Sequence, residues 1–285
     1  MQRNNSPRAG QGAVLLCAVL WSTSGLFIKL MTWHPMVIAG LRSLVAAVFM
    51  LAFRLVVPRR GRGTHQPFPL IAGALAYAFT MILFVIANKL TASANAILLQ
   101  YSAPVWAALL GWALIREKPR WEHWLALGMV MGGLFLFFKD GLAGGSLLGD
   151  SLAVLSGIFF GANSVFMRMQ KKGNPADTML LSHIIAAAIC LPFAGIYPPA
   201  FSPLNILIIL FMGIIQIGCA SLLFAYGIKR ISAIQAMLTA MVEPILNPLW
   251  VLLATGEKPS PSALVGGGII VLAVLIPSLV GKGRA

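Results

Sequence analysis

The sequence has 285 residues, of which 59% are hydrophobic and only 10% charged, with a mean hydropathy of +0.89. Because a soluble domain carries about 25% charged residues, this composition indicates a membrane protein with little polypeptide outside the lipid bilayer. The formal charge of +14 does not indicate a nucleic-acid partner, since the basic residues occur singly or in short clusters between apolar runs.

Apolar runs long enough to span a bilayer follow one another along the whole chain. A spanning helix needs about 20 mostly apolar residues. The predicted spans are 12–30, 35–57, 68–88, 92–115, 120–138, 148–169, 175–197, 204–228, 231–254 and 261–280. The first lacks a small-residue cleavage site, so we expect a retained helix rather than a signal peptide. The sequence therefore predicts an all-α integral membrane protein with ten transmembrane helices.

An internal repeat divides the chain into two halves. Residues 89–119 and 229–259 align without gaps at a shift of 140, and eight of the 31 positions are identical, including Pro104 with Pro244 and Glu117 with Glu257. Self-similarity at a fixed period indicates two copies of one structural unit. We predict a first five-helix repeat over 1–145 and a second over 146–285. Because five is odd, the second repeat should enter the membrane from the opposite side.

The basic residues predict the orientation. If both termini are cytoplasmic, the inner loops contain sixteen Lys and Arg residues and the outer loops contain four, with Arg42 inside a span. Cytoplasmic loops carry such an excess of positive charge. Inverted repeats of this kind characterise secondary transporters. The sequence contains no metal-binding, nucleotide-binding or hydrolase motif, so we expect neither an enzyme nor a cofactor; a channel or scaffold is the less favoured alternative.

Two motifs carry a family resemblance. They are Pro104 followed by Glu117-Lys118, and Glu243-Pro244 followed by Gly256-Glu257-Lys258, together with Ala39-Gly40-Leu41-Arg42-Ser43 in the second span. The sequence resembles the drug/metabolite transporter superfamily, specifically its EamA-type exporters, and within it the bacterial aromatic amino-acid exporters. The resemblance implies a basket-like ten-helix fold with a central cavity lined mainly by helices 1, 3, 4, 6, 8 and 9. Ala103 replaces the acid in the first copy of the acid-proline pair.

Polar and aromatic side chains inside the spans form the predicted substrate-binding set. Trp21 and Phe160 occupy equivalent positions in the two repeats at a shift of 139. Polar groups inside a membrane face protein or water rather than lipid. Each single residue could instead serve helix packing or an interhelical hydrogen bond. The candidates are Trp21, Ser24, Tyr77, Thr80, Phe84, Asn95, Tyr101, Phe160, Asn163, Gln216, Thr239, Glu243 and Trp250.

Three ionisable side chains lie well inside the predicted spans. Glu243 is a candidate for proton coupling or for binding a substrate ammonium group, but it could also bind backbone groups freed by Pro244. For Arg42 we favour a structural tie over a contact with a substrate carboxylate. For His183 we favour a hydrogen-bonded packing role. Glu117 and Glu257 each precede a helix, and we expect them to be structural.

These patterns, together with the family resemblance, predict a transporter in the bacterial inner membrane that exports neutral amino acids with large apolar or aromatic side chains. Export of other amphipathic metabolites or of drug-like cations is the alternative. The expected partners are the small-molecule substrate and the lipid bilayer, with no nucleic acid, and we expect the protein to act as a monomer.

Overall fold

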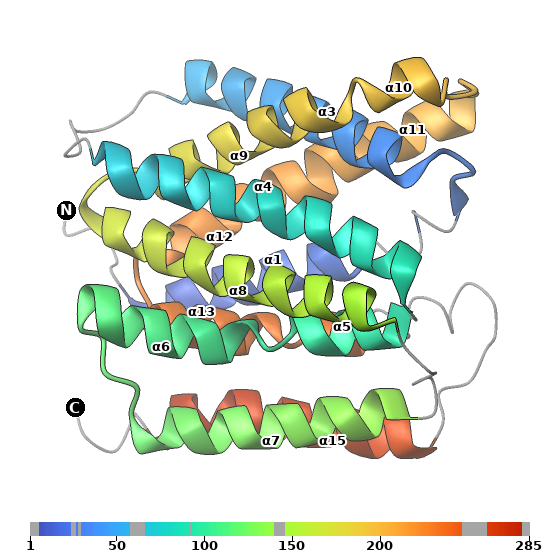
Figure 1. Cartoon of the computed structure of the whole chain (residues 1–285). Coiled ribbons are helices and arrows are strands. Elements are labelled where there is room, and N and C mark those ends of the chain that lie inside the picture. The colour runs from blue at the N-terminus through green and yellow to red at the C-terminus, as the bar shows by residue number, and fades with distance from the viewer. Residues whose placement is uncertain are drawn as a thin grey trace.

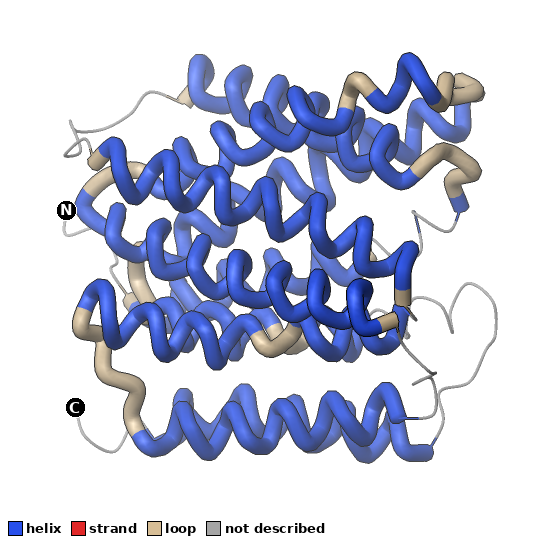
Figure 2. Tube along the Cα trace, viewed as in Figure 1, coloured by secondary structure: helices blue, strands red, loops and turns tan. Residues whose placement is uncertain are grey.

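The computed structural model describes residues 6–23, 27, 30–57, 66–91, 93–139, 146–246 and 261–280. Within these ranges the regular structure is helical and no strand occurs (Figure 2). The helices of the first half are α1 (Pro7–Ser22), α3 (Pro35–Val56), α4 (Pro67–Leu90), α5 (Ser93–Gln100), α6 (Ala103–Ile115) and α7 (Trp121–Phe138). Those of the second half are α8 (Leu147–Met169), η2 (Gln170–Lys172), α9 (Pro175–Cys190), α10 (Phe193–Ile196), α11 (Pro203–Phe211), η3 (Met212–Cys219), α12 (Ala220–Ile228), α13 (Ala233–Ala240) and α15 (Pro261–Val280).

Six helical segments are long and apolar enough to cross a membrane. They are 35–56, 67–87, 95–115, 147–172, 175–196 and 203–228. The apolar helices 233–246 and 264–275 are shorter, and α1 has 16 residues. The prediction of an all-helical, multi-pass membrane protein is therefore confirmed. The count of ten spans stays a prediction, although helix is described within each of the ten predicted runs.

Prolines set the start of many helices. Pro7, Pro35, Pro67, Pro175, Pro203 and Pro261 each occupy the first position of a helix. Proline is favoured there because its fixed φ suits a helix and its missing N–H would have no partner in the helix. For this reason α1 begins at Pro7, five residues before the start that hydropathy predicted.

The fourth predicted span is not one helix, as the hydropathy pattern suggested. The helix α5 ends at Gln100, Tyr101 and Ser102 form a turn, and α6 begins at Ala103. The same break occurs 140 residues later, where α13 ends at Ala240, residues 241–242 form a turn and residues 243–246 are helical again. Pro104 and Pro244 follow the two breaks, because a proline lacks the N–H that would continue the preceding helix.

The eighth predicted span contains a second irregularity. Between α11 and α12, the segment η3 is a π-helix from Met212 to Cys219. π-helical turns are rare and occur frequently at functional sites. This one carries Gln216, a polar side chain that is only 2% exposed.

Equivalent helices of the two halves make equivalent contacts. The helix α4 packs along α8, and α1 packs along α12, which is the same pairing with the halves exchanged; α3 packs on α9, and α7 on α15. Figure 1 shows that α1 and α8 run in opposite directions along the bundle. Helices α7 and α15 form a layer at one side of it, where Gly133 allows close approach to Gly266 and Ile270.

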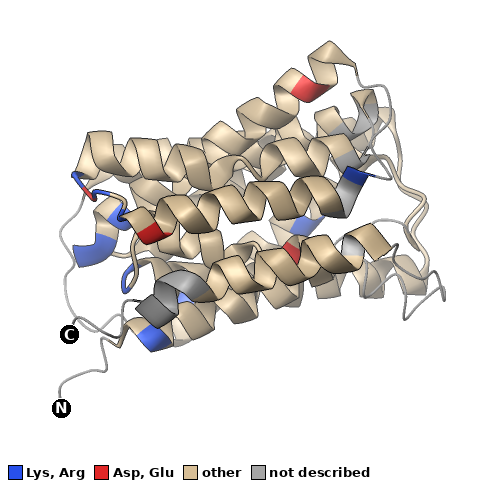
Figure 3. Cartoon of the chain, turned by 90° about the horizontal axis from the view of Figure 1, so that it is seen from below, with Lys and Arg blue, Asp and Glu red and all other residues tan. Residues whose placement is uncertain are grey.

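The charged side chains gather at one end of the bundle. Figure 3 shows most of the described Lys and Arg residues at the end where both chain termini lie. We call this end, where α3, α6, α8 and α12 end, the basic end; by their places in or next to these helix ends it includes Arg54, Lys118, Arg120, Arg168 and Lys229. Lys139 ends α7 at the opposite end. The separation matches the charge asymmetry on which the predicted orientation rests.

Candidate substrate cavity

A central cavity lies where the two broken helices meet the first helix of each half. Its lining comes from both halves of the chain: Trp21, Arg42, Tyr77, Thr80, Met81, Phe84, Gln100, Tyr101, Phe160, Gln216, Ile217 and Glu243. The cavity volume is about 100 Å³, within about 600 Å³ of space free of protein atoms. One buried water needs roughly 10–15 Å³ by the first of these measures, so the cavity has room for several waters.

Aromatic rings form one wall of the cavity. The ring centroids of Trp21 and Phe160 are 5.9 Å apart in an edge-on arrangement, and those of Tyr77 and Phe160 are 6.3 Å apart. Phe224 supports Trp21 from behind, at 5.5 Å. Trp21 and Phe160 are 5% and 7% exposed, so these rings present a dry apolar surface to any molecule in the cavity.

Residues that line the same space carry polar atoms without partners. Among the described residues, Nε1 of Trp21, Nε of Arg42 and Oε1 of Gln216 are buried and have no hydrogen-bond partner. The amide nitrogen of Gln216 donates to the backbone carbonyl of Trp21 at 3.4 Å, which ties the π-helix to α1. Because most buried polar groups in proteins are hydrogen-bonded, two donors and one acceptor left open in one cavity indicate a polar ligand or water.

Glu243 and Arg42 supply opposite charges to the cavity. The hydroxyl of Tyr101 donates a hydrogen bond to the carboxylate of Glu243, so each broken helix contributes one member of this pair. Arg42 lies on α3 and lines the cavity together with Glu243. Nε of Arg42 has no hydrogen-bond partner among the described residues, so the choice between a structural tie and a contact with a substrate carboxylate stays a prediction.

Small residues on α8 hold the first broken helix against the cavity. A Cβ on Gly157 would lie 2.7 Å from the carbonyl oxygen of Gln100, and one on Gly161 would lie 2.7 Å from that of Ala103. Only glycine therefore permits α8 to approach the break this closely. The side chain of Gln100 also donates to Ser156 at 2.8 Å, and Ser156 donates to the carbonyl of Thr80 at 2.9 Å.

The cavity includes eight of the thirteen predicted residues. These are Trp21, Tyr77, Thr80, Phe84, Tyr101, Phe160, Gln216 and Glu243. Three others make structural contacts instead: Asn163 donates to the carbonyl of Gly73 at 2.9 Å, Asn95 donates to Thr91 at 3.5 Å, and Thr239 donates to the carbonyl of Gln235 at 2.7 Å. Ser24 and Trp250 lie outside the described residues.

Four lining residues were not in the predicted substrate-binding set, namely Arg42, Met81, Gln100 and Ile217. Gln100 could have been found, because it is a polar residue four positions before Pro104 in an apolar span. Met81 and Ile217 carry no such signal. His183, by contrast, takes the packing role expected of it, with Nε2 at 2.9 Å from the hydroxyl of Ser221 and no solvent exposure. No group of three His, Cys, Asp or Glu residues in the described ranges could hold a metal ion.

A central cavity at the breaks of two discontinuous helices is typical of secondary transporters. Comparison with known proteins gives the same class. The sequence profile of the EamA-like transporter family matches residues 8–139 and again residues 147–279. The chain belongs to the EamA-like transporter family, of the drug/metabolite transporter superfamily, and contains two copies of its domain.

Relatives in other organisms are transporters as well. The chain is 26% identical to the uncharacterized transporter YwfM of Bacillus subtilis, over 93% of this chain and 92% of that protein. It is also 26% identical to an uncharacterized transporter of Archaeoglobus fulgidus, over 94% and 96% of the two chains. Identity to the uncharacterized inner membrane transporter YedA of Escherichia coli K12 is 24%, over 94% and 90%. These names specify no substrate.

A solved structure, titled only as the crystal structure of a protein, has the same fold. It superposes with a TM-score of 0.83 at 20% identity and covers 98% of this chain and 100% of its own. At this identity the likeness concerns the fold alone. The resemblance to aromatic amino-acid exporters is therefore not established by these comparisons, whereas membrane transport is.

Proposed function

We propose that the protein exports neutral amino acids with large apolar or aromatic side chains by alternating access. The observation that carries this proposal is the chemistry of the cavity, where Arg42 and Glu243 supply opposite charges beside the rings of Trp21, Tyr77 and Phe160. A zwitterion with an apolar side chain has complementary groups. An intramembrane ionisable residue is by default a functional-site candidate.

The open hydrogen-bonding atoms suit the two ends of an α-amino acid. Nε of Arg42 and Nε1 of Trp21 can each donate a hydrogen bond to a carboxylate, and Oε1 of Gln216 can accept one from an ammonium group. Glu243 adds the negative charge that an ammonium group requires. Charge-assisted hydrogen bonds of this kind are roughly twice as strong as neutral ones. The aromatic wall then receives the side chain.

Export of drug-like cations is the alternative function, because Glu243 and the aromatic rings alone would suit an amphipathic cation. Arg42 argues against it. A cation in the same cavity would meet the guanidinium group of Arg42, and like charges repel strongly where little water screens them.

The location and orientation form part of the proposal. We infer a bacterial inner membrane with the basic end in the cytoplasm and the protein acting as a monomer. The positive-inside rule supports this orientation, because the α6–α7 connection, which carries Lys118 and Arg120, lies at the basic end. A cysteine in place of Lys118 should react with an impermeant reagent only from the cytoplasm. A cysteine in place of Lys258, which lies outside the described residues, should react only from the other side if the repeats are inverted; labelling of both from one side contradicts the inversion.

Flux in sealed proteoliposomes tests the proposed function. Labelled phenylalanine should cross with saturable kinetics in the presence of the protein, and unlabelled tryptophan or leucine should compete more strongly than alanine. The same assay with and without an imposed pH gradient tells whether protons are coupled to transport. Absence of saturable flux for every neutral amino acid, with saturable flux of an amphipathic cation, would replace the proposal by its alternative.

A further inference from the structure

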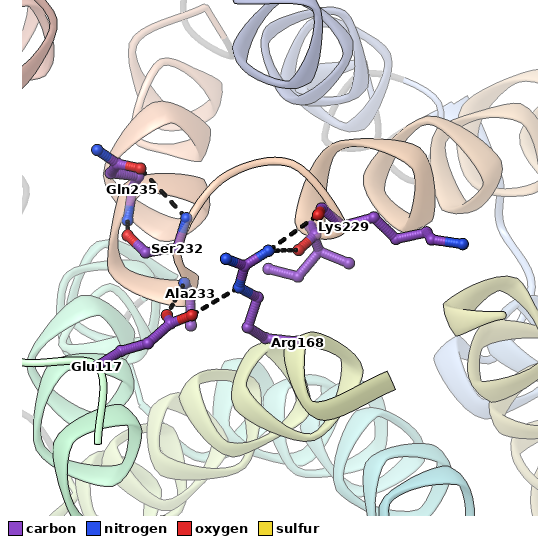
Figure 4. A network of polar contacts seen from close by, with 7 residues as sticks. Glu117, Arg168, Lys229, Ser232, Ala233 and Gln235 are labelled. Atoms are coloured by element: carbon purple, nitrogen blue, oxygen red, sulfur yellow. Dashed lines mark hydrogen bonds and ion pairs between the residues drawn. The ribbon is translucent and has the colours of Figure 1, made fainter. Parts of the chain in front are cut away.

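An ion pair at the basic end joins the two halves of the chain. Nε of Arg168 donates to Oε1 of Glu117 at 2.7 Å, and the two side chains are only 14% and 25% exposed (Figure 4). Glu117 belongs to the connection after α6 in the first half, and Arg168 to the last turn of α8 in the second. We expected Glu117 to be structural because it precedes a helix; its hydrogen-bond partners, Arg168 and Ala233, lie in the other half of the chain.

Backbone groups of the connection between α12 and α13 complete this network. Nη1 of Arg168 donates to the carbonyls of Ile228 at 3.1 Å and Lys229 at 2.9 Å. Oε2 of Glu117 accepts the N–H of Ala233 at 3.4 Å, at the first position of α13. The end of α6, α8 and the connection to α13 therefore meet at one ion pair, in which the fork of Arg168 contacts the carboxylate through Nε and the backbone carbonyls through Nη1.

The start of α13 is itself fixed in place. Ser232 and Gln235 form a reciprocal capping box: the N–H of Gln235 donates to the hydroxyl of Ser232, and the N–H of Ser232 donates to Oε1 of Gln235 (Figure 4). A capping box satisfies two N–H groups that the helix leaves open. The N–H of Ala233, next to this capping box, donates the hydrogen bond to Glu117. The contact to Glu117 is thus made by a rigid helix end.

The backbone on the other side of the pair adopts an unusual conformation. Arg116 has φ 55°, the only positive value at a non-glycine residue in the described chain. This left-handed residue ends α6, and the N–H of Glu117 then bonds the carbonyl of Gly111 at 3.1 Å. Non-glycine residues adopt this conformation uncommonly. Here it brings Glu117 back toward α8 instead of letting the chain continue away from the bundle.

The pair lies on the helices that line the substrate cavity. On α8, Phe160 lines the cavity and Arg168 follows eight residues later, about 12 Å further along the axis at 1.5 Å per residue. A separate vestibule of about 600 Å³ opens at the basic end, and Glu117 and Arg168 lie in its wall together with Phe68 and Lys171. The ion pair thus stands at the end of the bundle through which a cytoplasmic substrate would enter.

We propose that the Glu117–Arg168 ion pair, with its contacts to the α12–α13 connection, is the inner gate of the transporter and is closed in this structure. Opening the gate separates α6 from the ends of α8 and α12 and connects the vestibule to the cavity. This inference rests on the alternating-access function proposed above. The sequence repeats the opposite charges at Lys29 and Glu257, equivalent to Arg168 and Glu117 at shifts of 139 and 140, and both lie outside the described residues.

Chemical accessibility of the cavity tests the gate directly. In a protein whose Cys17, Cys190 and Cys219 are replaced by alanine, Thr80→Cys places one thiol in the cavity lining. Its modification by an impermeant maleimide is followed in everted membrane vesicles, which expose the cytoplasmic side. Adding Glu117→Gln or Arg168→Gln should raise the modification rate about tenfold, within the 5–150-fold typical of conformational coupling. Arg168→Lys retains the charge but not the forked geometry, and should give an intermediate rate.

A second ion pair at the same end provides the control. Nη1 of Arg54 lies 3.4 Å from Asp177 and joins α3 to α9, two helices that already pack along each other. Arg54→Gln should leave the modification rate of the thiol introduced by Thr80→Cys unchanged. An unchanged modification rate in folded Glu117→Gln and Arg168→Lys variants would overturn the proposed gate. It would not bear on the proposed substrate. Faster modification in these variants would uphold the gate. If the unaltered protein then shows no amino-acid flux, the proposed substrate is refuted.

Discussion

Arg42 of the first half and Glu243 of the second line one cavity, and although the structure describes both side chains, they form no ion pair with each other. Two opposite charges held apart inside a membrane protein each need a partner or water, because burying an unpaired charge costs several kcal/mol. A zwitterionic substrate would supply a partner for both. On the proposed function, this relationship is what distinguishes an amino-acid cavity from one built for a simple cation.

The first prediction concerns Arg42. Arg42→Gln should weaken transport of phenylalanine roughly 10–100-fold, because a hydrogen bond to a charged group contributes about 1.5–3 kcal/mol. Competition by phenylethylamine, which has no carboxylate, should weaken far less. Competition assays with the two compounds on the same variant measure the difference, and Arg42→Lys should recover part of the loss. Equal losses for both compounds would assign Arg42 to structure instead.

The second prediction concerns Glu243. Glu243→Gln retains an acceptor for the hydroxyl of Tyr101 but cannot carry a charge. We expect the variant to fold normally, to lose most of its amino-acid flux and to lose the pH dependence of whatever flux remains. Measurement of initial rates across a range of pH, in variant and parent, gives the result. If the variant keeps the pH profile of the parent, Glu243 has only a structural role, as a partner for Tyr101 and for the backbone at the break before Pro244.

The third prediction concerns the aromatic wall. Trp21→Ala or Phe160→Ala should reduce the apparent affinity for phenylalanine by about 1–3 kcal/mol and that for alanine by much less, since burial contributes about 25 cal/mol per Å² of apolar area. Phe159→Ala serves as the control, because Phe159 is adjacent on α8 but packs against Phe79 and is absent from the cavity lining. Similar losses for both substrates in the Phe160 variant would indicate damage to packing.

The fourth prediction concerns Gly161, on which the approach of α8 to the first helix break depends. Gly161→Ala places a methyl group within 2.8 Å of both the carbonyl oxygen of Ala103 and the amide nitrogen of Ala107. Overpacking of this kind costs about 1–3 kcal/mol, so the melting temperature in detergent should fall. Gly132→Ala on α7, where an added Cβ meets nothing within 4 Å, should leave it unchanged. A Gly161→Ala variant that melts at the same temperature as the parent would show that α8 and α6 can move apart without loss of stability.

Hydropathy and the internal repeat predicted the helical class and most helix positions, because length and apolar composition largely decide whether a segment spans a bilayer. The same pattern could not show the break at Tyr101, since hydropathy averages over a window and residues 95–115 as a whole are apolar enough for one span. Pro104 and Pro244 were the residues that could have predicted the two breaks, because proline cannot continue a preceding helix. The π-helix at Met212 has no such sequence signal, because it contains neither proline nor a run of polar residues.

The site was only partly predictable for a related reason. Trp21, Phe160 and Glu243 stood out as aromatic or charged residues within spans, and they do meet. Asn163 is as polar as Gln216 but faces the carbonyl of Gly73 on α4. Whether a polar side chain meets a neighbouring helix or the cavity depends on tertiary packing, which periodicity does not encode. Arg42 was left out of the predicted set because an arginine near a helix end can also extend to the membrane surface, yet it lines the cavity.

The central claim is that the cavity binds both charged ends of an amino acid together with its apolar side chain. Calorimetric titration of the purified protein with phenylalanine, phenylethylamine and 3-phenylpropionate tests it most directly, because the three compounds share the ring and differ only in the charged groups. Phenylalanine should bind at least about tenfold more tightly than either analogue, since each loses a charged hydrogen-bonding group of about 1.5–3 kcal/mol. Binding of phenylethylamine as tight as that of phenylalanine would contradict the claim.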